Sequence, residues 1–197
     1  MKGGSAKTTT VAFLAHALAH GGRRVACVDA DPAGSLLRWR DHGEWTLPVL
    51  GMASRKVHVD LPNVADRYDV LIVDTPPLDE QAGIVASAVR AATDVLIPVA
   101  PSTMELDRLP PILAVIDDAA ALATAPPGLR VLLTRAVTRA SSVEAARQVI
   151  VEDLGRKVLT TVIPRLERYA LAFGGPVVLP AGDAYALAAD ELERMLA

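Results

Sequence analysis

The chain has 197 residues, a length that suits one domain over residues 1–197. Its net charge of −3 neither favours nor excludes a nucleic-acid partner. No apolar run approaches the roughly 18 to 20 residues of a membrane span, and the N-terminus lacks the apolar core of a signal peptide. The single cysteine, Cys27, lies in an apolar run. We therefore expect a cytoplasmic protein without disulfides and without a membrane partner.

The first ten residues, MKGGSAKTTT, have the composition of a loop that binds nucleotide phosphates. Small residues let consecutive backbone N–H groups turn toward an anion, Lys7 is placed for the β- and γ-phosphates, and the Thr8 hydroxyl is placed for Mg²⁺. The helix that follows adds partial positive charge at its N-terminus. The predicted nucleotide-binding residues of this loop are Gly3, Gly4, Ser5, Ala6, Lys7, Thr8 and Thr9.

Two positions depart from the usual G-x-x-x-x-G-K-[ST] pattern. Ala6 stands where a glycine precedes the lysine, and its Cβ disfavours a backbone with positive φ, which predicts slow turnover. Lys2 is an additional lysine before the glycine pair, at a position with no obvious purpose within one subunit. A short Gly/Lys run is, on its own, also typical of a plain surface loop.

Predicted helices and strands alternate along the rest of the chain. The expected strands cover residues 24–28, 48–50, 70–73, 95–99, 130–133 and 158–162. The expected helices cover residues 7–20, 80–91, 104–123, 142–154 and 183–196, with another from about residue 35 and a short one within 54–67. The helix over 104–123 is expected to bend or begin at Pro110 and Pro111, and Ser141 or Ser142 is expected to cap the helix over 142–154.

This alternation predicts an α/β fold of the P-loop NTPase type, with a doubly wound, mostly parallel sheet covered by helices on both faces. Apolar residues make up 51% of the chain and aromatic residues 4%. Such a composition suits helices packed on buried parallel strands. Ligands of these sheets bind at the carboxyl ends of the strands.

A phosphate loop normally connects a central strand to the first helix, yet no strand precedes the loop in this sequence. The first central strand is thus expected to be missing. We expect a gap or empty groove in the sheet between the strands that end at Asp74 and Val99. We also expect the natural protein to begin before Met1, with an apolar strand ahead of the loop.

Three carboxylates follow predicted strands. Asp74 ends the apolar run at 70–73 and is well placed to hold Mg²⁺ through a water molecule. Asp29 and Asp31 leave the neighbouring strand two residues apart, and a carboxylate beside the γ-phosphate could position the attacking water. Aspartates at such places are also common as strand-end or turn residues, as in the sequence DPAG at 31–34.

Three motifs together resemble one family. The loop K-G-G-x-x-K-T-T at 2–9, the segment VDADPAGS at 28–35, and DTPP at 74–77 followed by DVLIPVAPS at 94–102 resemble the ParA/MinD family of deviant Walker A P-loop ATPases. The similarity is closest to ParA-like plasmid and chromosome partition ATPases. It extends more weakly through LLTR at 132–135 and IPR at 163–165, and so spans nearly the whole chain.

The resemblance implies roles for individual residues. Lys2 would reach the nucleotide of the partner subunit, Lys7 would bind phosphate, and Asp31 would orient the water; these are the implied catalytic residues. Thr8 and Asp74 would hold the metal. Thr134 and Arg135 would lie near the adenine.

The resemblance further implies an ATP hydrolase with ATP and Mg²⁺ as cofactors, slow until stimulated by a partner. ParA-like proteins form an ATP sandwich homodimer that binds DNA without sequence preference, and a ParB-like centromere-binding protein stimulates hydrolysis. We would then expect a nucleoid-associated protein. Residues 130–168 carry eight Arg or Lys against four Asp or Glu, and the candidate DNA contacts are Arg147, Arg156 and Lys157. An ordinary solvated surface would show the same charges.

Other functions stay open at this stage. A metabolic ATP-dependent ligase of related fold, similar to dethiobiotin or cobyrinic acid amide synthases, is an alternative from another class. A MinD-like positioning ATPase would need a basic amphipathic tail, whereas the sequence DELERMLA at the C-terminus is mainly acidic. A nitrogenase-reductase-like protein would need several cysteines. A module that binds nucleotide but barely hydrolyses it is a further possibility, because of Ala6.

Overall fold

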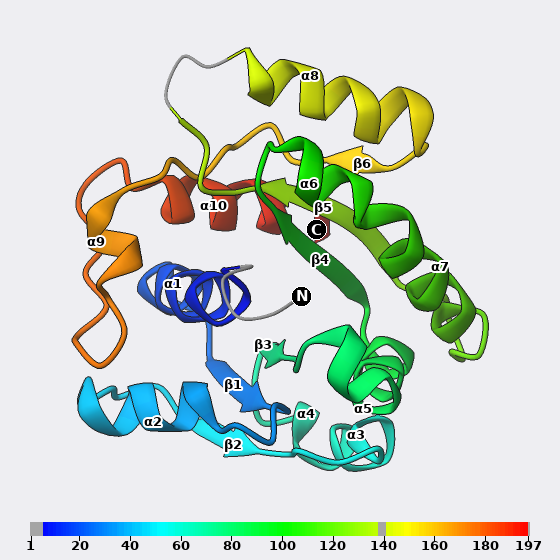
Figure 1. Cartoon of the computed structure of the whole chain (residues 1–197). Helices are drawn as coiled ribbons and strands as arrows, with labels where there is room; N and C mark the ends of the chain where they lie inside the picture. Colours follow the sequence, from blue (N-terminus) through cyan, green and yellow to red (C-terminus); the bar gives the residue numbers. More distant parts are fainter. Residues whose placement is uncertain (1–5, 138–140, 197) are drawn as a thin grey trace.

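The structure, a computed structural model, describes residues 6–137 and 141–196. All paired strands in it run parallel and form two three-stranded sheets, in the orders β2-β1-β3 and β4-β5-β6 (Figure 1). The strands are β1 (Val25–Asp29), β2 (Val49–Gly51), β3 (Val70–Asp74), β4 (Asp94–Val99), β5 (Gly128–Leu133) and β6 (Lys157–Val158). The predicted parallel α/β fold is confirmed.

Helices precede or follow each strand, as the alternating pattern predicts. They are α1 (Lys7–His20), α2 (Ser35–His42), α3 (Val57–Asp60), α4 (Pro62–Ala65), α5 (Leu78–Ala91), α6 (Thr103–Asp107), α7 (Leu109–Ala120), α8 (Ser142–Gln148), α9 (Glu167–Ala170) and α10 (Ala184–Leu196). A π-helical turn, Val149–Asp153, continues α8. Within the described residues, none of the helices combines the length and apolar character needed to cross a membrane.

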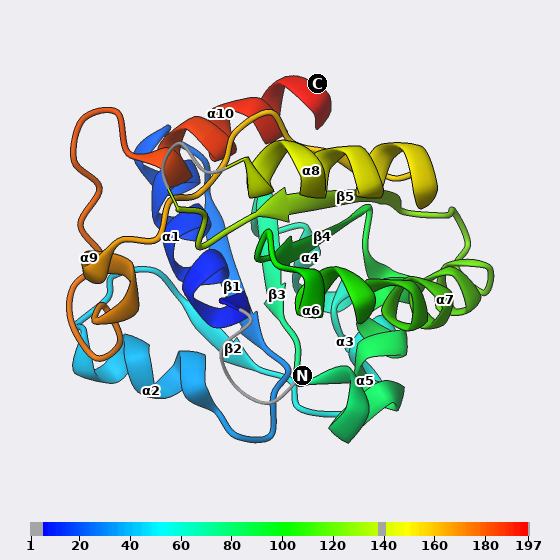
Figure 2. The same ribbon diagram turned by 45° about the horizontal axis from the view of Figure 1, so that its top comes forward.

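The two faces of each strand pack against different helices. On β5, Leu132 belongs to a buried cluster with α1, α2 and α10, whereas Val131 and Leu133 belong to a second cluster with α5, α7 and α8. Successive side chains of a strand point to opposite faces, so this division places helices on both sides of the sheets. Figure 2 shows α1 lying alongside β1, with α10 beside it.

Cys27 lies in the middle of β1 and is fully buried. Burial raises the pKa of its thiol to about 12, and the charges of Asp74 and Asp29 act in the same direction. Cys27 is therefore a core residue rather than a reactive thiol.

The last strand is shorter than predicted: β6 ends at Val158 rather than at residue 162. The buried Glu191 carboxylate of α10 accepts hydrogen bonds from the amides of Thr160 and Thr161, at 2.6 and 2.8 Å. The Leu159 amide still donates to the Val131 carbonyl of β5, and the next amide on that side, that of Thr161, binds α10 instead.

Two helix predictions have different outcomes. The region over 104–123 is divided between α6 and α7, and α7 begins at Leu109 with proline in its first turn, as expected. Ser141 occupies the N-cap position of α8, but neither it nor another side chain makes a capping hydrogen bond there. The prediction of a serine cap was wrong, because Ser141 has helical backbone angles rather than the extended ones of a capping residue.

The sheet is interrupted between β3 and β4, which are not paired with each other. This is the place where the sequence predicts a missing strand, and Figure 1 shows the two strands apart. Helix α1 covers both sheets on one face, since Val70 of β3, Leu96 of β4 and Leu132 of β5 pack in its cluster. Helix α5 covers both on the other face.

Candidate phosphate and magnesium site

The predicted site lies where β1 and β3 end and α1 begins. The Thr8 hydroxyl, in the first turn of α1, donates a 2.7 Å hydrogen bond to Oδ2 of Asp74 at the end of β3. The Ala30 amide, just after β1, donates to the Asp74 carbonyl at 2.9 Å and so aligns the two strand ends. Two residues that are 66 positions apart in the sequence are thus brought together as predicted.

Asp74 is buried and only partly satisfied. It is 1% exposed, and its Oδ1 has no hydrogen-bond partner among the described residues. Burial raises the pKa of Asp74 to about 7, and the charges of Asp29 and Asp31 raise it further, whereas the Thr8 hydrogen bond and the Lys7 charge act to lower it. A buried carboxylate oxygen without a partner is a place where a cation or its water ligand can bind.

The turn after β1 separates the roles of its two aspartates. Asp29 is 1% exposed, and its carboxylate accepts hydrogen bonds from the amides of Asp31, at 3.1 Å, and Leu37, at 3.0 Å. Asp29 therefore shapes the turn and caps the first turn of α2 from outside the helix. This role of Asp29 was not predicted, although its place as the first aspartate of D-x-D, at the end of a buried strand, is a sequence signal for it.

Asp31 lies at the exposed side of the same turn. Its Oδ1 accepts a hydrogen bond from the Ala33 amide at 2.9 Å, and its carbonyl accepts one from Gly34 at 2.8 Å. Gly34 has φ 62°, a conformation that glycine adopts without strain. The Asp31 side chain is half-buried, and its other carboxylate oxygen has no hydrogen-bond partner among the described residues, as a water-orienting group requires.

The loop before α1 is described only from Ala6 onward. Ala6 has φ 58° and ψ 17°, so the alanine occupies the left-handed conformation that a glycine would favour. Holding an alanine in this conformation costs on the order of 1 kcal/mol. The strain is the structural consequence of having Ala6 in place of the usual glycine. Lys2, Gly3, Gly4 and Ser5 lie outside the described residues, and their roles stay predictions. Lys7 and Thr9 lie in the first turn of α1.

Thr134 and Arg135 lie at the carboxyl end of β5, on the same edge of the strands. Thr134 is fully buried with no partner for its hydroxyl among the described residues. Arg135 has φ 54° and a loose ion pair with Glu105, 3.5 Å from Nη2 to Oε1, without hydrogen-bond geometry. The IPR segment lies beside them, because the Ala136 amide donates to the Ile163 carbonyl.

The candidate DNA residues lie apart from this edge. Arg147 of α8 donates to the carbonyls of Leu159 and Thr160, at 2.9 and 3.3 Å. Arg156 pairs with Asp117, and Lys157 is exposed at the start of β6. Arg156 and Lys157 line one hollow, whereas Arg147 does not line it.

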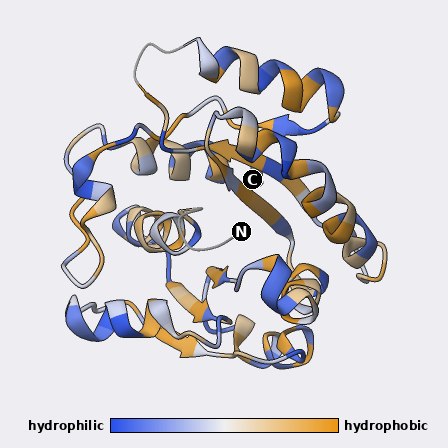
Figure 3. Ribbon diagram, viewed as in Figure 1, coloured by the Kyte–Doolittle hydropathy of each residue, from blue (hydrophilic) through white to orange (hydrophobic). Residues whose placement is uncertain are grey.

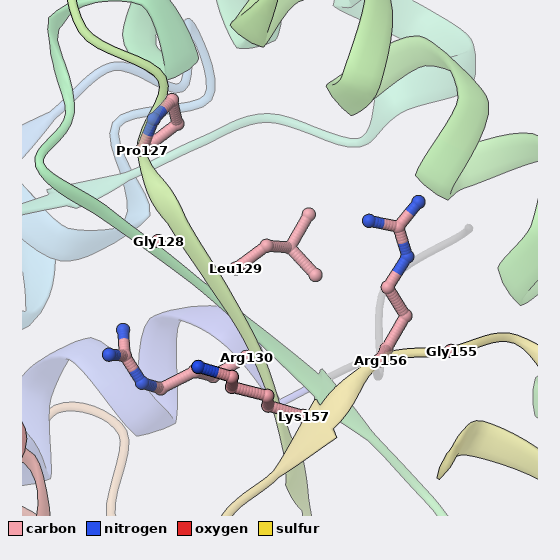
Figure 4. Close-up of a pocket in the computed structure, with 7 residues that line it drawn as sticks. All are labelled: Pro127, Gly128, Leu129, Arg130, Gly155, Arg156 and Lys157. Carbon is pink, nitrogen blue, oxygen red and sulfur yellow. The ribbon is translucent and has the colours of Figure 1, made fainter. Parts of the chain in front are cut away.

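A hollow of about 250 Å³ lies at the amino ends of β5 and β6 (Figure 4). Figure 4 shows Arg130 and Lys157 extending to one side of these strands and Arg156 to the other. Arg130 is paired with Asp94 and Arg156 with Asp117, so two of the three cations that line this hollow have counter-ions.

The residues at the carboxyl ends fit a magnesium ion held together with nucleotide phosphates. No group of three or more His, Cys, Asp or Glu side chains forms a metal cluster among residues 6–137 and 141–196. Mg²⁺ is commonly bound by one or two protein oxygens together with substrate phosphates, and Thr8 and Asp74 supply that number. When bound, the ion neutralises charge on the phosphates during phosphoryl transfer.

A parallel α/β fold with a lysine and threonine at the first helix, and an aspartate at the end of the adjacent strand, defines a P-loop nucleotide-binding ATPase. A family model described as "CobQ/CobB/MinD/ParA nucleotide binding domain" matches residues 1–177. The chain belongs to this family. It is an ATPase that uses ATP and Mg²⁺, and it resembles the ParA/MinD members.

Three known proteins illustrate the similarity. "Maintenance of carboxysome distribution protein A" of Halothiobacillus neapolitanus is 32% identical over 201 residues, covering 100% of this chain and 91% of the relative. "Chromosome-partitioning ATPase Soj" of Thermus thermophilus is 28% identical over 232 residues, covering 97% and 92%. Cobyrinic acid a,c-diamide synthase from Mycobacterium smegmatis, solved with an ATP analog and magnesium, has a TM-score of 0.80 at 24% identity, covering 99% and 92%. The last similarity concerns the fold alone.

Proposed function

We propose that this chain is a positioning ATPase that distributes an intracellular cargo by an ATP-driven cycle of dimerisation and DNA binding. The observation that carries the proposal is the Thr8–Asp74 pair beside the Asp31 turn, in a chain whose whole length matches a carboxysome-distribution protein. The chromosome-partitioning relative supports the same class of activity on another cargo. The similarity to the carboxysome-distribution protein favours an organelle-like cargo over a plasmid.

In the proposed cycle, dimerisation is thermodynamically linked to ATP binding. ATP shared between two subunits stabilises the dimer, and its hydrolysis removes that stabilisation. Lys7 would bind the phosphates within one subunit, Asp31 would orient the attacking water, and Lys2 would contact the partner's phosphates. In this scheme Thr134 and Arg135 lie near the adenine, and a ParB-like or cargo-specific adaptor stimulates hydrolysis.

DNA binding is the second part of the proposal. Of the three candidate cations, Lys157 is the most accessible, since Arg147 binds two carbonyls and Arg156 pairs with Asp117. We therefore assign the leading contact to Lys157, on a face that dimerisation would double. Non-specific binding through phosphates falls steeply with salt, and nucleoid association would follow from it.

The test is the variant Asp31→Ala, with Asp41→Ala on the exposed side of α2 as the matched control. Asp31→Ala should keep ATP binding, stop turnover and leave an ATP-bound dimer in sedimentation, whereas the control should hydrolyse ATP like the native chain. In the double variant Lys2→Ala, Asp31→Ala, the dimer should be lost while monomer affinity for ATP changes little. Normal hydrolysis by Asp31→Ala would refute the assigned role.

A second measurement separates positioning from ligase chemistry. The positioning function predicts ATP-dependent DNA binding that weakens with salt and is reduced in Lys157→Ala. Binding that is equal without ATP would contradict it. Turnover stimulated by a small carboxylic acid, and not by DNA with an adaptor, would identify a ligase instead.

A further inference from the structure

The turn that carries Asp31 is held from two sides. On the inner side, the buried Asp29 carboxylate accepts a hydrogen bond from the Asp31 amide at 3.1 Å. On the outer side, Arg38 of α2 reaches back over the turn. Its Nη1 donates to the Ala33 carbonyl, and its Nη2 donates to the hydroxyl oxygen of Ser35 at 3.2 Å. One guanidinium group thus joins the turn to the first residue of α2.

The guanidinium group of Arg38 lies over the part of the turn whose backbone is least restricted. A Cβ atom at Gly34 would lie 3.9 Å from Nη1 of Arg38. Gly34 has φ 62°, and a glycine has more conformational freedom to lose on folding than any other residue. The Ala33 carbonyl directly precedes Gly34, so the bond from Arg38 restricts motion where the turn is otherwise free to move.

Arg38 connects this turn to a rigid element. Leu36 and Trp39, which lie before and after it in α2, are 0% and 1% exposed and pack in the same cluster as α1. Arg38 itself is exposed, and Figure 3 shows both hydrophobic and hydrophilic residues along α2. The buried face of the helix fixes the backbone of Arg38, and this allows its side chain to fix the turn.

Arg38 differs from the other arginine of α2 in what it binds. Arg40 pairs with Asp41, at 2.6 Å. Among residues 6–137 and 141–196, Arg38 has no carboxylate partner, and its donors go to a carbonyl and a hydroxyl. Exposed contacts of this kind change the free energy of unfolding little when they are removed. The contacts of Arg38 therefore suit the placement of a functional turn better than the stabilisation of the fold.

We propose that Arg38 is a positioning residue for ATP hydrolysis, which acts by holding the turn that carries Asp31. This role depends on the proposed water-orienting role of Asp31. Ala33 links the two side chains, because its amide donates to Oδ1 of Asp31 at 2.9 Å and its carbonyl accepts from Arg38. Without Arg38, the Ala33 backbone and the Asp31 carboxylate bound to it gain freedom to shift. A misplacement of about 1 Å at a reacting centre can slow a reaction by up to about 100-fold.

The first test compares steady-state ATP hydrolysis by Arg38→Ala and by Arg40→Ala, the matched control on the same helix. Arg40 binds Asp41 and the Val49 carbonyl, both outside the turn. Arg38→Ala should lower kcat about tenfold and change the KM for ATP less than about twofold, because the turn, and not a contact to the nucleotide, is altered. Arg40→Ala should keep the native kcat.

The conservative variant Arg38→Lys should have an intermediate kcat. A lysine ammonium can donate to the Ala33 carbonyl, but it lacks the planar fork that binds the carbonyl and the Ser35 hydroxyl together. Millimolar guanidinium chloride should raise the kcat of Arg38→Ala and leave the native chain and Arg40→Ala unchanged, since the free ion can replace the lost group. A loss that came only from a less stable helix would not be rescued in this way.

A double variant tests the connection to Asp31. Arg38→Ala combined with Asp31→Ala should have the same turnover as Asp31→Ala alone, because Arg38 acts through Asp31. A further loss in the double variant would overturn the inference, since Arg38 would then act by another route.

Three other outcomes would overturn it. In the first, Arg38→Ala keeps the native kcat while Asp31→Ala is inactive, a result that leaves the proposed function intact. In the second, Arg38→Ala and Arg40→Ala lose kcat equally, which would assign Arg38 to the stability of α2. In the third, guanidinium chloride does not restore any of the kcat lost in Arg38→Ala. Normal hydrolysis by Asp31→Ala would instead refute the proposed function itself.

Discussion

Asp69 and Asp74 lie at opposite ends of one strand, yet the pKa values of their carboxyl groups are shifted in opposite directions. Asp69, just before β3, accepts from the amide and side chain of Arg24, which lowers its pKa to about 2. Burial raises the pKa of Asp74, at the end of β3, to about 7. At the amino end Asp69 is paired with Arg24, whereas the Oδ1 atom of Asp74 at the carboxyl end has no hydrogen-bond partner among the described residues. This difference supports the prediction that a cation and phosphates bind at the carboxyl end of the strands rather than at the amino end.

The largest expected effect concerns Lys7. Lys7→Ala should weaken Mg²⁺-dependent ATP binding about 100-fold, because a charge-assisted contact to the phosphates is lost. Lys56→Ala removes an exposed lysine before α3 and serves as the control, with unchanged affinity. Isothermal titration calorimetry measures both. Equal ATP affinities for the two variants would contradict the prediction that the phosphates bind at the carboxyl ends of the strands.

The next effect is a pH dependence at Asp74. Its folded-state pKa of about 7 exceeds that of an unfolded aspartate, so this group's stabilisation is complete below about pH 4 and is lost as the pH rises through 7. Asp74→Asn cannot lose that proton. Without Mg²⁺ and nucleotide, we expect the variant to exceed the native chain in free energy of unfolding by about 2 kcal/mol at pH 8, and by less at pH 5. Denaturant unfolding at the two pH values checks this, and a native chain whose stability rises over this range relative to the variant contradicts it.

Sequence patterns predicted the contact between Thr8 and Asp74 better than the contacts that support it. The bounds of α1 and the meeting of Thr8 with Asp74 follow from local motifs and strand alternation, and both are confirmed. The length of β6 could not be predicted, because Glu191, 30 residues away, binds the Thr161 amide that would extend it. The division of roles between Asp29 and Asp31 depends on which carboxylate meets backbone amides, and this is a property of the folded turn.

A smaller effect is expected at Ala6. Ala6→Gly should stabilise the chain by about 0.5–1 kcal/mol, since glycine adopts the left-handed conformation without strain. Ala33→Gly is the control, because Ala33 is not among the positive-φ residues and should lose stability on the same change. Thermal unfolding of both variants measures the difference. A loss of stability in both would show that Ala6 is not strained.

The smallest effect is expected at Asp69. Its lowered pKa means that its contribution is present above about pH 4 and is lost as the pH falls through 2. Asp69→Asn should therefore be slightly less stable than the native chain at pH 7, with a difference that narrows toward acid, and should bind ATP normally. Chemical unfolding at pH 7 and pH 3 tests the trend. Weakened ATP binding in this variant would mean that the amino end contributes to the site.

The most direct test of the contrast between the carboxyl and amino ends of the strands is amide hydrogen exchange with and without Mg²⁺ and ATP. We predict protection at the carboxyl ends of the strands, over residues 6–10, 29–37 and 74–79, together with residues 134–136. We predict no change at the amino ends, over residues 128–131 and 155–158. Protection confined to the amino ends, or none at residues 6–10 and 74–79 at saturating ATP, would contradict the assignment of the site.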